Sequence, residues 1–488
     1  MKNINYISKI FNINLIGKIF GIIFTILVTR SLGASTELDK YYFILTVFFL
    51  ASSVFISVFK NVYTPYLTLN KFNNNNIFQN TCILIILAYV FLIILYWFLH
   101  KLIFLNTNDL FYIVSISPIF LINCLYGLNS SYFNSIKMYG KPETIYNSRL
   151  MIQLFIYIIL IYNSSGVSEL LLSTFIANVI ILILIIIQSV KYLKVRFKFK
   201  FKDVNYALFK SSLAYGFFTT FVIAQGLLIN YVLLNENEGV LTIYNTVNKV
   251  TGIPFSLLTT ATIGIFIVEL TEINKSKSFI NKVIDPNIKL SNYYVGFTLI
   301  ILFILFDEIL ELFFVKNNLN DSQIYFAYFL LFILIFIEYL KYLHSLFVRY
   351  FVVNNQMKML YYLSVTGLIA LVLFYIIFKK FNIQNSILYS LLFSNLLIVI
   401  FEIIYLTRKK IYNLKSFVAL YFKPLIFFIP VLVLNILLID QYQFVSHLNL
   451  VLKLITLILS FALAQIFFKD RFVNDILSYF KLRITNKK

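Results

Sequence analysis

The sequence predicts an all-α polytopic membrane protein with about fourteen transmembrane helices. Of its 488 residues, 60% are hydrophobic and only 12% are charged, whereas soluble domains carry about 25% charged residues. Apolar runs of about 20 residues recur from end to end, and each is long enough to cross a hydrocarbon core of about 30 Å. The first run has no small-residue cleavage site after it, so we expect a retained helix and not a signal peptide.

The predicted spans follow one another with short connections. In chain order they cover residues 8–30, 41–67, 77–99, 110–133, 143–163, 167–190, 211–233, 240–269, 292–314, 323–347, 358–378, 384–406, 416–439 and 448–468. None of the intervening loops is long enough to form a folded external domain.

The basic residues are distributed unevenly between the two sides of the membrane. The chain has 41 Lys and Arg and a net charge of +21, which could suggest binding to nucleic acid. With the N-terminus in the cytoplasm, however, about 28 of these residues fall on the cytoplasmic side and about six on the opposite side, as the positive-inside rule describes. We therefore expect both termini in the cytoplasm and no nucleic acid as a partner.

A polar linker divides the chain into two halves. The stretch 191–210, which contains "KYLKVRFKFKFK", follows the sixth span, and the segments 132–143 and 348–359 resemble each other six spans apart. Two pseudo-symmetric six-helix lobes are a common transporter plan, with the substrate site between them. We expect an N-lobe at 1–200, a C-lobe at 201–410, and two extra helices with a basic tail at 411–488.

The first span carries a lysine near its middle, where a lone charge costs roughly 2.5 to 3.5 kcal/mol on insertion scales. On a helix, Lys18 shares one face with Asn14, Gly21, Thr25 and Thr29. The second and eighth spans show the same pattern, with a lysine on a polar stripe. Span two has Ser53, Ser57, Lys60 and Thr64; span eight has Asn245, Lys249, Gly252, Ser256 and Thr260; span seven adds Thr219, Gly226 and Asn230 without a charge.

These lysine stripes predict a water-filled, cationic cavity. No acid lies along them, and such cations are tolerated at depth only where they face water or an anion; the alternative is that each lysine extends to a lipid headgroup, which is most plausible for Lys60. Arg149 could line the cavity or meet headgroups, and Arg30 could anchor the interface or act as a gate. An anionic substrate follows, and phosphate or pyrophosphate is the group that lysine binds as a point charge.

Other ionisable residues point to no catalytic or metal centre. The three histidines lie far apart, and both cysteines fall inside apolar segments, so no metal site or disulfide framework is expected. Glu338 and Lys341 lie three residues apart in span ten, and we expect them to pair.

Two segments resemble the MurJ/MviN family of lipid II flippases, part of the multidrug, oligosaccharidyl-lipid and polysaccharide (MOP) exporter superfamily. "GKIFGIIFTILVTRSLGASTELDKYYF" (17–43) is similar to its first helix and outer turn, through Lys18, Gly21, Arg30, Gly33-Ala34 and Asp39. "GVLTIYNTVNKVTGIPF" (239–255) is similar to its eighth helix from Gly239 to Pro254, with Lys249 at the position of a functional arginine. The resemblance gives Arg30, Asp39, Gly21 and Pro254 gate or structural roles.

The sequence also departs from that family's pattern. Phe24 and Thr25 stand where a second basic residue is usual, Ser52 and Ser53 replace an arginine pair, and Gly252 replaces an acid. These departures favour a related, Wzx-like flippase of the bacterial cytoplasmic membrane. Its substrate would be an undecaprenyl-pyrophosphate-linked oligosaccharide of the O-antigen or capsule type, with lipid II as the alternative.

The resemblance implies further properties. The molecule would be a V-shaped, inward-open monomer that works by alternating access, with the polyprenyl tail along a groove by spans thirteen and fourteen. No cofactor is expected; energy would come from the membrane potential, H⁺ or Na⁺. Besides membrane lipids, a polysaccharide polymerase and chain-length machinery would be partners. A drug antiporter of the same fold would need an acid in the cavity, and a glycan polymerase or ligase would need a large outward loop, so we expect no enzyme.

Overall fold

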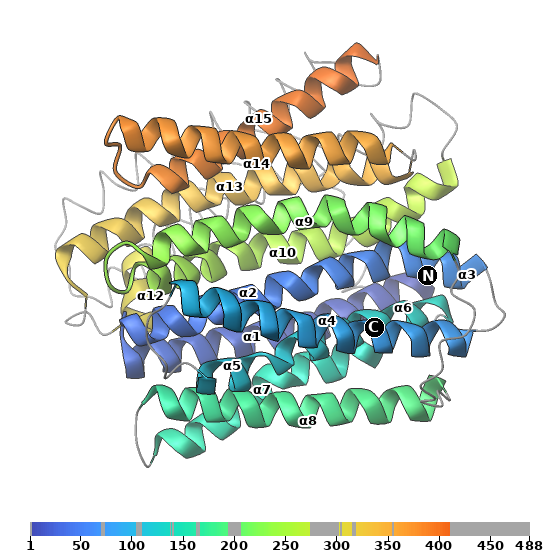
Figure 1. Cartoon of the computed structure of the whole chain (residues 1–488), viewed down its shortest axis with the longest axis horizontal. Coiled ribbons are helices and arrows are strands. Elements are labelled where there is room, and N and C mark those ends of the chain that lie inside the picture. Colours follow the sequence, from blue (N-terminus) through green and yellow to red (C-terminus); the bar gives the residue numbers. More distant parts are fainter. Residues whose placement is uncertain are drawn as a thin grey trace, which may run out of the picture. The chain divides into compact units, whose positions relative to one another are not determined.

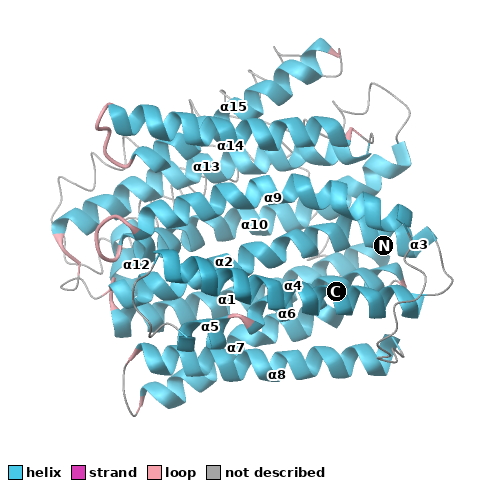
Figure 2. Ribbon diagram, viewed as in Figure 1, coloured by secondary structure: helices cyan, strands magenta, loops and turns pink. Residues whose placement is uncertain are grey.

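The computed structural model of the chain describes residues 2–69, 74–103, 110–136, 138, 141–162, 166–193, 206–273, 302, 305–314, 319–353 and 356–409. Within these ranges the chain consists of helices joined by short loops (Figure 2). The helices are α1 (Lys2–Leu32), α2 (Thr36–Val58), α3 (Thr64–Leu69), α4 (Asn74–Ile103), α5 (Leu110–Ile116), α6 (Pro118–Ser135), α7 (Lys141–Ile161), α8 (Val167–Leu193), α9 (Tyr206–Leu234), α10 (Val240–Ile273), α12 (Phe306–Phe313), α13 (Asp321–Val353), α14 (Met357–Lys380) and α15 (Ser386–Arg408).

Ten segments in the described part are long and apolar enough to cross a membrane. They match the predicted spans one to seven and ten to twelve, and the helix α10 covers the predicted eighth span. Of the ninth span, the structure describes mainly α12. Spans thirteen and fourteen, the expected tail groove and the side chain of Thr260 lie outside the described residues. The polytopic helical fold is therefore confirmed, whereas the count of fourteen and the lobe boundaries stay predictions.

The chain divides into two compact units. The first contains residues 1–272 and 311–402, and the second contains 273–310 and 403–488. Of the second unit the structure describes only 273, 302, 305–310 and 403–409. The residues that form the sites described below belong to the first unit.

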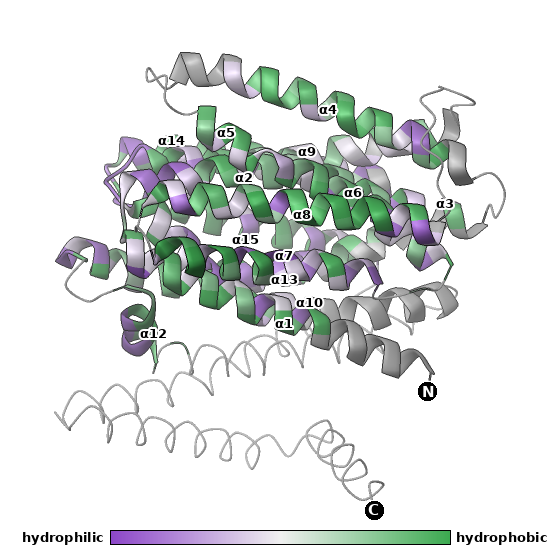
Figure 3. Ribbon diagram, turned by 90° about the horizontal axis from the view of Figure 1, so that it is seen from below, coloured by the Kyte–Doolittle hydropathy of each residue, from purple (hydrophilic) through white to green (hydrophobic). Residues whose placement is uncertain are grey.

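Within the first unit, helices from the two sequence halves pack against each other. In the first half, α1 packs on α7, α2 on α6, and both α6 and α7 on α8. Across the halves α2 packs on α9, which also packs on α14 (Figure 1). The described parts of α4 and α8 are hydrophobic along most of their length (Figure 3).

Local sequence signals explain several helix boundaries. The side chain of Ser35 accepts a hydrogen bond from the backbone N–H of Leu38 and so caps the start of α2. Pro118, which lacks an N–H, separates α5 from α6 and occupies the first turn of α6. Beyond α2 the helix continues as a π-helical segment, Phe59–Tyr63, which includes Lys60. Such segments are rare and often lie at functional sites.

Candidate functional site: two lysines between α1 and α10

The lysines of α1 and α10 each reach across to a hydroxyl group on the other helix. Lys18 Nζ on α1 donates to the hydroxyl of Ser256 on α10, and Lys249 Nζ on α10 donates to Thr25 Oγ1 on α1 at 3.1 Å. The two contacts are seven residues apart on both helices, in opposite directions, so α1 and α10 run antiparallel here. Seven residues span about 10.5 Å of helix, which separates the two contacts by about two turns.

Neither ammonium group has an acidic partner in the described part of the chain. The ion pairs found there are Lys341 with Glu338 and His344 with Glu402. Lys249 lies 4.9 Å from the centre of the Tyr42 ring instead, a favourable cation–π distance. Because an ammonium group has three donors, each lysine keeps donors for a further acceptor. A phosphate oxygen is such an acceptor.

Further polar and basic groups surround the two lysines. Arg149 on α7 is close enough to Lys249 to interact with it electrostatically, and its guanidinium lies 5.9 Å from the centre of the Tyr146 ring. Like charges so near one another favour an anion between them. One turn from Lys249, Gly252 borders open space: a Cβ there would meet nothing within 4 Å. The structure thus brings Lys18, Lys249 and Arg149 into one region.

Beyond Thr25, α1 contacts the chain around α12. Thr29 Oγ1 donates to the backbone carbonyl of Phe313 at 2.6 Å. Arg30, which is exposed, donates to the backbone carbonyl of Glu311 at 3.0 Å. These contacts join the first and second sequence halves at the end of α1 that is predicted to face outward.

Asp39 closes the same end by capping α10. Its buried carboxylate accepts hydrogen bonds from the backbone N–H of Gly239 at 2.8 Å and from the N–H and hydroxyl of Thr242, both at 2.6 Å. These N–H groups belong to the first turn of α10, where the helix dipole also favours a negative charge. Asp39 sits in the first turn of α2, so one carboxylate ties α2 to α10.

Two features require glycine at position 239, where the turn before α10 lies against the turn before α2. Its φ is +78°, a conformation that costs other residues roughly 1–2 kcal/mol. A Cβ at this position would also lie 2.6 Å from both the Cβ and the carbonyl oxygen of Ala34. The turn between α9 and α10 can therefore touch the turn between α1 and α2 only with glycine here.

The remaining predicted site residues lie elsewhere or bond within their own helix. Lys60 is exposed in the π-helical segment Phe59–Tyr63. Asn245 and Asn230 donate to the carbonyls of Leu241 and Gly226, four residues earlier. Ser57 is half-buried, Gly21 approaches Leu150 of α7 rather than α10, and Pro254 lies inside α10 between Lys249 and Ser256. The predicted substrate-binding roles of Lys60, Ser57, Asn230 and Asn245 stay predictions, as do the gate or structural roles of Gly21 and Pro254.

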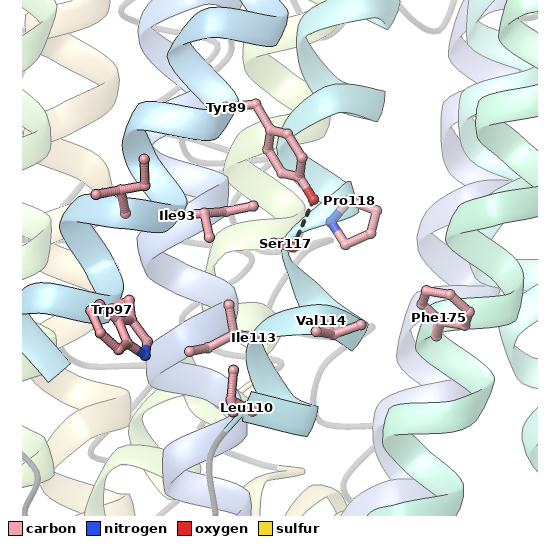
Figure 4. Close-up of a pocket in the computed structure, with 10 residues that line it drawn as sticks. Tyr89, Ile93, Trp97, Leu110, Ile113, Val114, Ser117, Pro118 and Phe175 are labelled. Carbon is pink, nitrogen blue, oxygen red and sulfur yellow. Dashed lines mark hydrogen bonds between the residues drawn. The ribbon is translucent and has the colours of Figure 1, made fainter. Parts of the chain in front are cut away.

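Two apolar cavities lie along α4, away from the lysines. One, of about 350 Å³, is lined by residues of α4, α5, the start of α6 and α8, including Trp97, Val114 and Phe175, with a 2.9 Å hydrogen bond between Tyr89 and Ser117 beside it (Figure 4). The other, of about 280 Å³, is formed by α4, α6 and α8. Their linings offer no charged group, so neither suits an anionic headgroup.

Sequence reasoning missed three contributors to the site. Tyr42 faces Lys249, and Gly239 and Thr242 hold Asp39. Helical periodicity along one span gives the face of a residue but not its partner 200 or more positions away. The expected pairing of Glu338 with Lys341 is confirmed, at 2.7 Å.

Known proteins resemble this chain in structure and not in sequence. No protein-family model matches the sequence, and no curated protein matches it. Among solved structures, the lipid II flippase MurJ in an inward-closed conformation superposes with a TM-score of 0.73 at 15% identity, over 94% of this chain and 98% of that one. A MOP superfamily transporter from Pyrococcus furiosus, described as having a binding pocket of reversed polarity, gives 0.60 at 13% identity, over 85% and 94%.

A multidrug transporter of the MATE family in its outward-facing conformation also superposes, with a TM-score of 0.60 at 12% identity over 83% of this chain and 95% of that one. The chain therefore has the fold of MOP superfamily transporters, and it is a multi-pass membrane protein.

Proposed function

We propose that the protein is a flippase that moves a lipid-linked saccharide, joined to its polyprenyl carrier by a pyrophosphate, across the bacterial cytoplasmic membrane. The observation that carries this proposal is the pair of ammonium groups, Lys18 and Lys249, that each bridge α1 and α10, about two turns apart, without a carboxylate partner among the described residues. Cations so placed suit an anionic headgroup, with the apolar tail left in lipid.

The contacts of α1 and α2 with α10 and α12 support an alternating-access cycle. Asp39, Arg30 and Thr29 hold the predicted outer end closed. A diphosphate that replaces Ser256 and Thr25 as acceptor for the lysines would loosen the α1–α10 contact and favour a second conformation. A membrane potential would bias the cycle, since moving one charge is worth about 2.3 kcal/mol per 100 mV.

Lipid II is the first candidate substrate. The likeness to the lipid II flippase MurJ covers nearly the whole of both chains, and it supports a lipid-linked substrate better than a drug. An acid in the cavity, which a drug antiporter would need, is not supplied by Asp39, because its carboxylate is occupied by the start of α10.

A glycan of the O-antigen or capsule type is the second candidate, and three positions favour it. Ser52, where the lipid II flippases have an arginine, is buried and accepts a 2.8 Å hydrogen bond from Asn123. Phe24 is buried against Tyr157, and Gly252 leaves open space where an acid would be. A different sugar or peptide portion would fit a site altered in this way.

Replacement of either lysine tests the proposal. Lys18→Ala and Lys249→Ala should each abolish export of the lipid-linked glycan, because the pyrophosphate loses its counter-charge, while the protein remains in the membrane at normal abundance. Lys379→Ala, an exposed lysine near the end of α14, is the matched control and should export normally. Normal surface glycan in both cavity variants would refute the assignment.

Complementation distinguishes the two substrates. A strain depleted of its lipid II flippase should grow when it expresses this chain if lipid II is the substrate. If it does not grow, while the chain restores polymer to a strain that lacks an O-antigen or capsule flippase, the second candidate is correct.

A further inference from the structure

A second polar pair lies away from the lysines, between α13 and α15. His344 Nδ1 and Glu402 Oε1 are 2.8 Å apart. The side chain of Glu402 is completely buried, while that of His344 keeps 23% of its surface exposed. The other carboxyl oxygen of Glu402, Oε2, is buried and has no hydrogen-bond partner among the residues that the structure describes.

Burial restricts the number of protons that this pair can hold. With one shared proton, the pair is neutral overall, as imidazole and carboxylic acid or as imidazolium and carboxylate. A second proton, which Oε2 could accept, gives the pair a charge of +1, and loss of the shared proton gives −1. A net charge in an apolar interior costs several kcal/mol, so a change in proton count requires water to reach the pair. The partly exposed imidazole offers the route.

Other ionisable groups near the pair already have partners or lie toward the helix ends. Lys341, one turn earlier on α13, is held by Glu338 at 2.7 Å, and Tyr244 of α10 interacts with that pair. Tyr342 flanks His344 on α13, and Tyr405 follows Glu402 on α15. Among the described residues of the first unit, Lys358 lies in the first turn of α14 and Lys210 lies near the start of α9.

We propose that His344 and Glu402 form a proton-binding site whose occupancy is coupled to the conformational cycle. The proposal rests on the transport function proposed above and names the coupling ion and its residues. The site is neutral when α13 and α15 are packed together as in this structure. It takes up a proton through His344 from water when the helix ends predicted to be cytoplasmic separate. Acidification therefore favours the conformation that is open at that end and closed at the outer end.

Spin-label distances in the full-length chain test this coupling. Cys82 and Cys124 are first replaced by alanine, and spin labels are attached at Glu37→Cys and Ser322→Cys. Both positions are exposed, in the first turns of α2 and α13, and the distance between the labels reports the outer contact around Glu238. In nanodiscs, the ratio of molecules with a short label-to-label distance (outer end closed) to molecules with a long one should rise on acidification. One linked proton changes it by up to about tenfold per pH unit.

Glu402→Gln and His344→Gln should each remove this pH dependence. Glu338→Gln, a carboxyl on α13 outside the pair, should retain it. If Glu402→Gln does not fold, His344→Gln decides alone, because its side chain is partly exposed. The proposal is overturned if the distance ratio of the wild type does not respond to pH. It is also overturned if the ratio in both pair variants responds to pH as strongly as it does in the wild type.

Binding of undecaprenyl pyrophosphate, measured at fixed pH on the same samples, separates this proposal from the proposed function. Binding without a pH response leaves the flippase assignment intact and removes the proton site. A pH response that depends on His344 and Glu402, without binding of undecaprenyl pyrophosphate, supports the proton site and removes the flippase assignment.

Discussion

Single residues in this protein show how an ammonium group on an apolar helix can find a partner on another helix. Lys18 and Lys249 each find a hydroxyl on the opposing helix, and Lys249 also meets the ring of Tyr42. Hydroxyl and ring neutralise no charge, so both groups remain available to an anion. The cost of their burial would be offset by a charged ligand, which is why we propose the lysines as recognition groups rather than structural ones.

The carboxylate of Asp39 accepts three hydrogen bonds at the outer contact, so its removal should have a local and measurable effect. Asp39→Ala should speed hydrogen exchange of the Gly239 and Thr242 amides roughly tenfold, since a hydrogen bond to a charged group is worth about 1.5–3 kcal/mol. Exchange mass spectrometry of the peptide that contains the start of α10 measures this rate.

Glu37→Ala is the matched control for that experiment. Glu37 lies in the same first turn of α2 but is exposed, and its removal should leave the α10 amides unchanged. Equal exchange in Asp39→Ala and the wild type would show that the carboxylate does not hold α10.

At the scale of elements, the α9–α10 turn meets the α1–α2 turn through glycine. Gly239→Ala should lower the thermal unfolding midpoint more than Gly33→Ala. Both positions have positive φ, +78° and +66°, so both variants carry the conformational cost of roughly 1–2 kcal/mol. Only the Cβ at position 239 collides with Ala34, because the space around Gly33 is open. Differential scanning calorimetry of the two purified variants provides the comparison, and equal midpoints would mean that the turns do not touch.

The elements themselves were largely predictable from the sequence. Length and hydropathy are enough to define a membrane helix, because the bilayer fixes the length and lipid requires the apolar surface. The predicted spans one to seven and ten to twelve therefore coincide with observed helices. The break at Pro118 and the π-helical segment at Phe59–Tyr63 were not predicted, since both depend on local backbone geometry that hydropathy does not report.

The candidate site was predictable only in part, for a physical reason. Periodicity identified the faces of α1 and α10 that carry Lys18 and Lys249, because one helix fixes its own side-chain directions. It could not identify Ser256 as the partner of Lys18, 238 positions away, or Tyr42 beside Lys249. Nor did it connect His344 with Glu402, which lie on separate helices. Such partners are determined by packing between helices.

At the scale of the whole molecule, α10 makes two contacts of opposite kind with the first half of the chain. Toward the predicted outer end, Asp39 and its partners form a closed contact of strong hydrogen bonds. Further in, the lysines bind neutral hydroxyls that an anion can displace. In the proposed cycle, this arrangement would couple the ligand to the closure of the opposite end, which is what alternating access requires.

The account depends most on recognition of a pyrophosphate by Lys18 and Lys249, and direct binding of undecaprenyl pyrophosphate to the purified chain in nanodiscs tests it. The wild type should bind undecaprenyl pyrophosphate more tightly than neutral undecaprenol. Lys18→Ala and Lys249→Ala should each weaken that binding about tenfold or more, as expected for the loss of a hydrogen bond to a charged group. Equal binding of both lipids, unchanged in the two variants, would contradict the account.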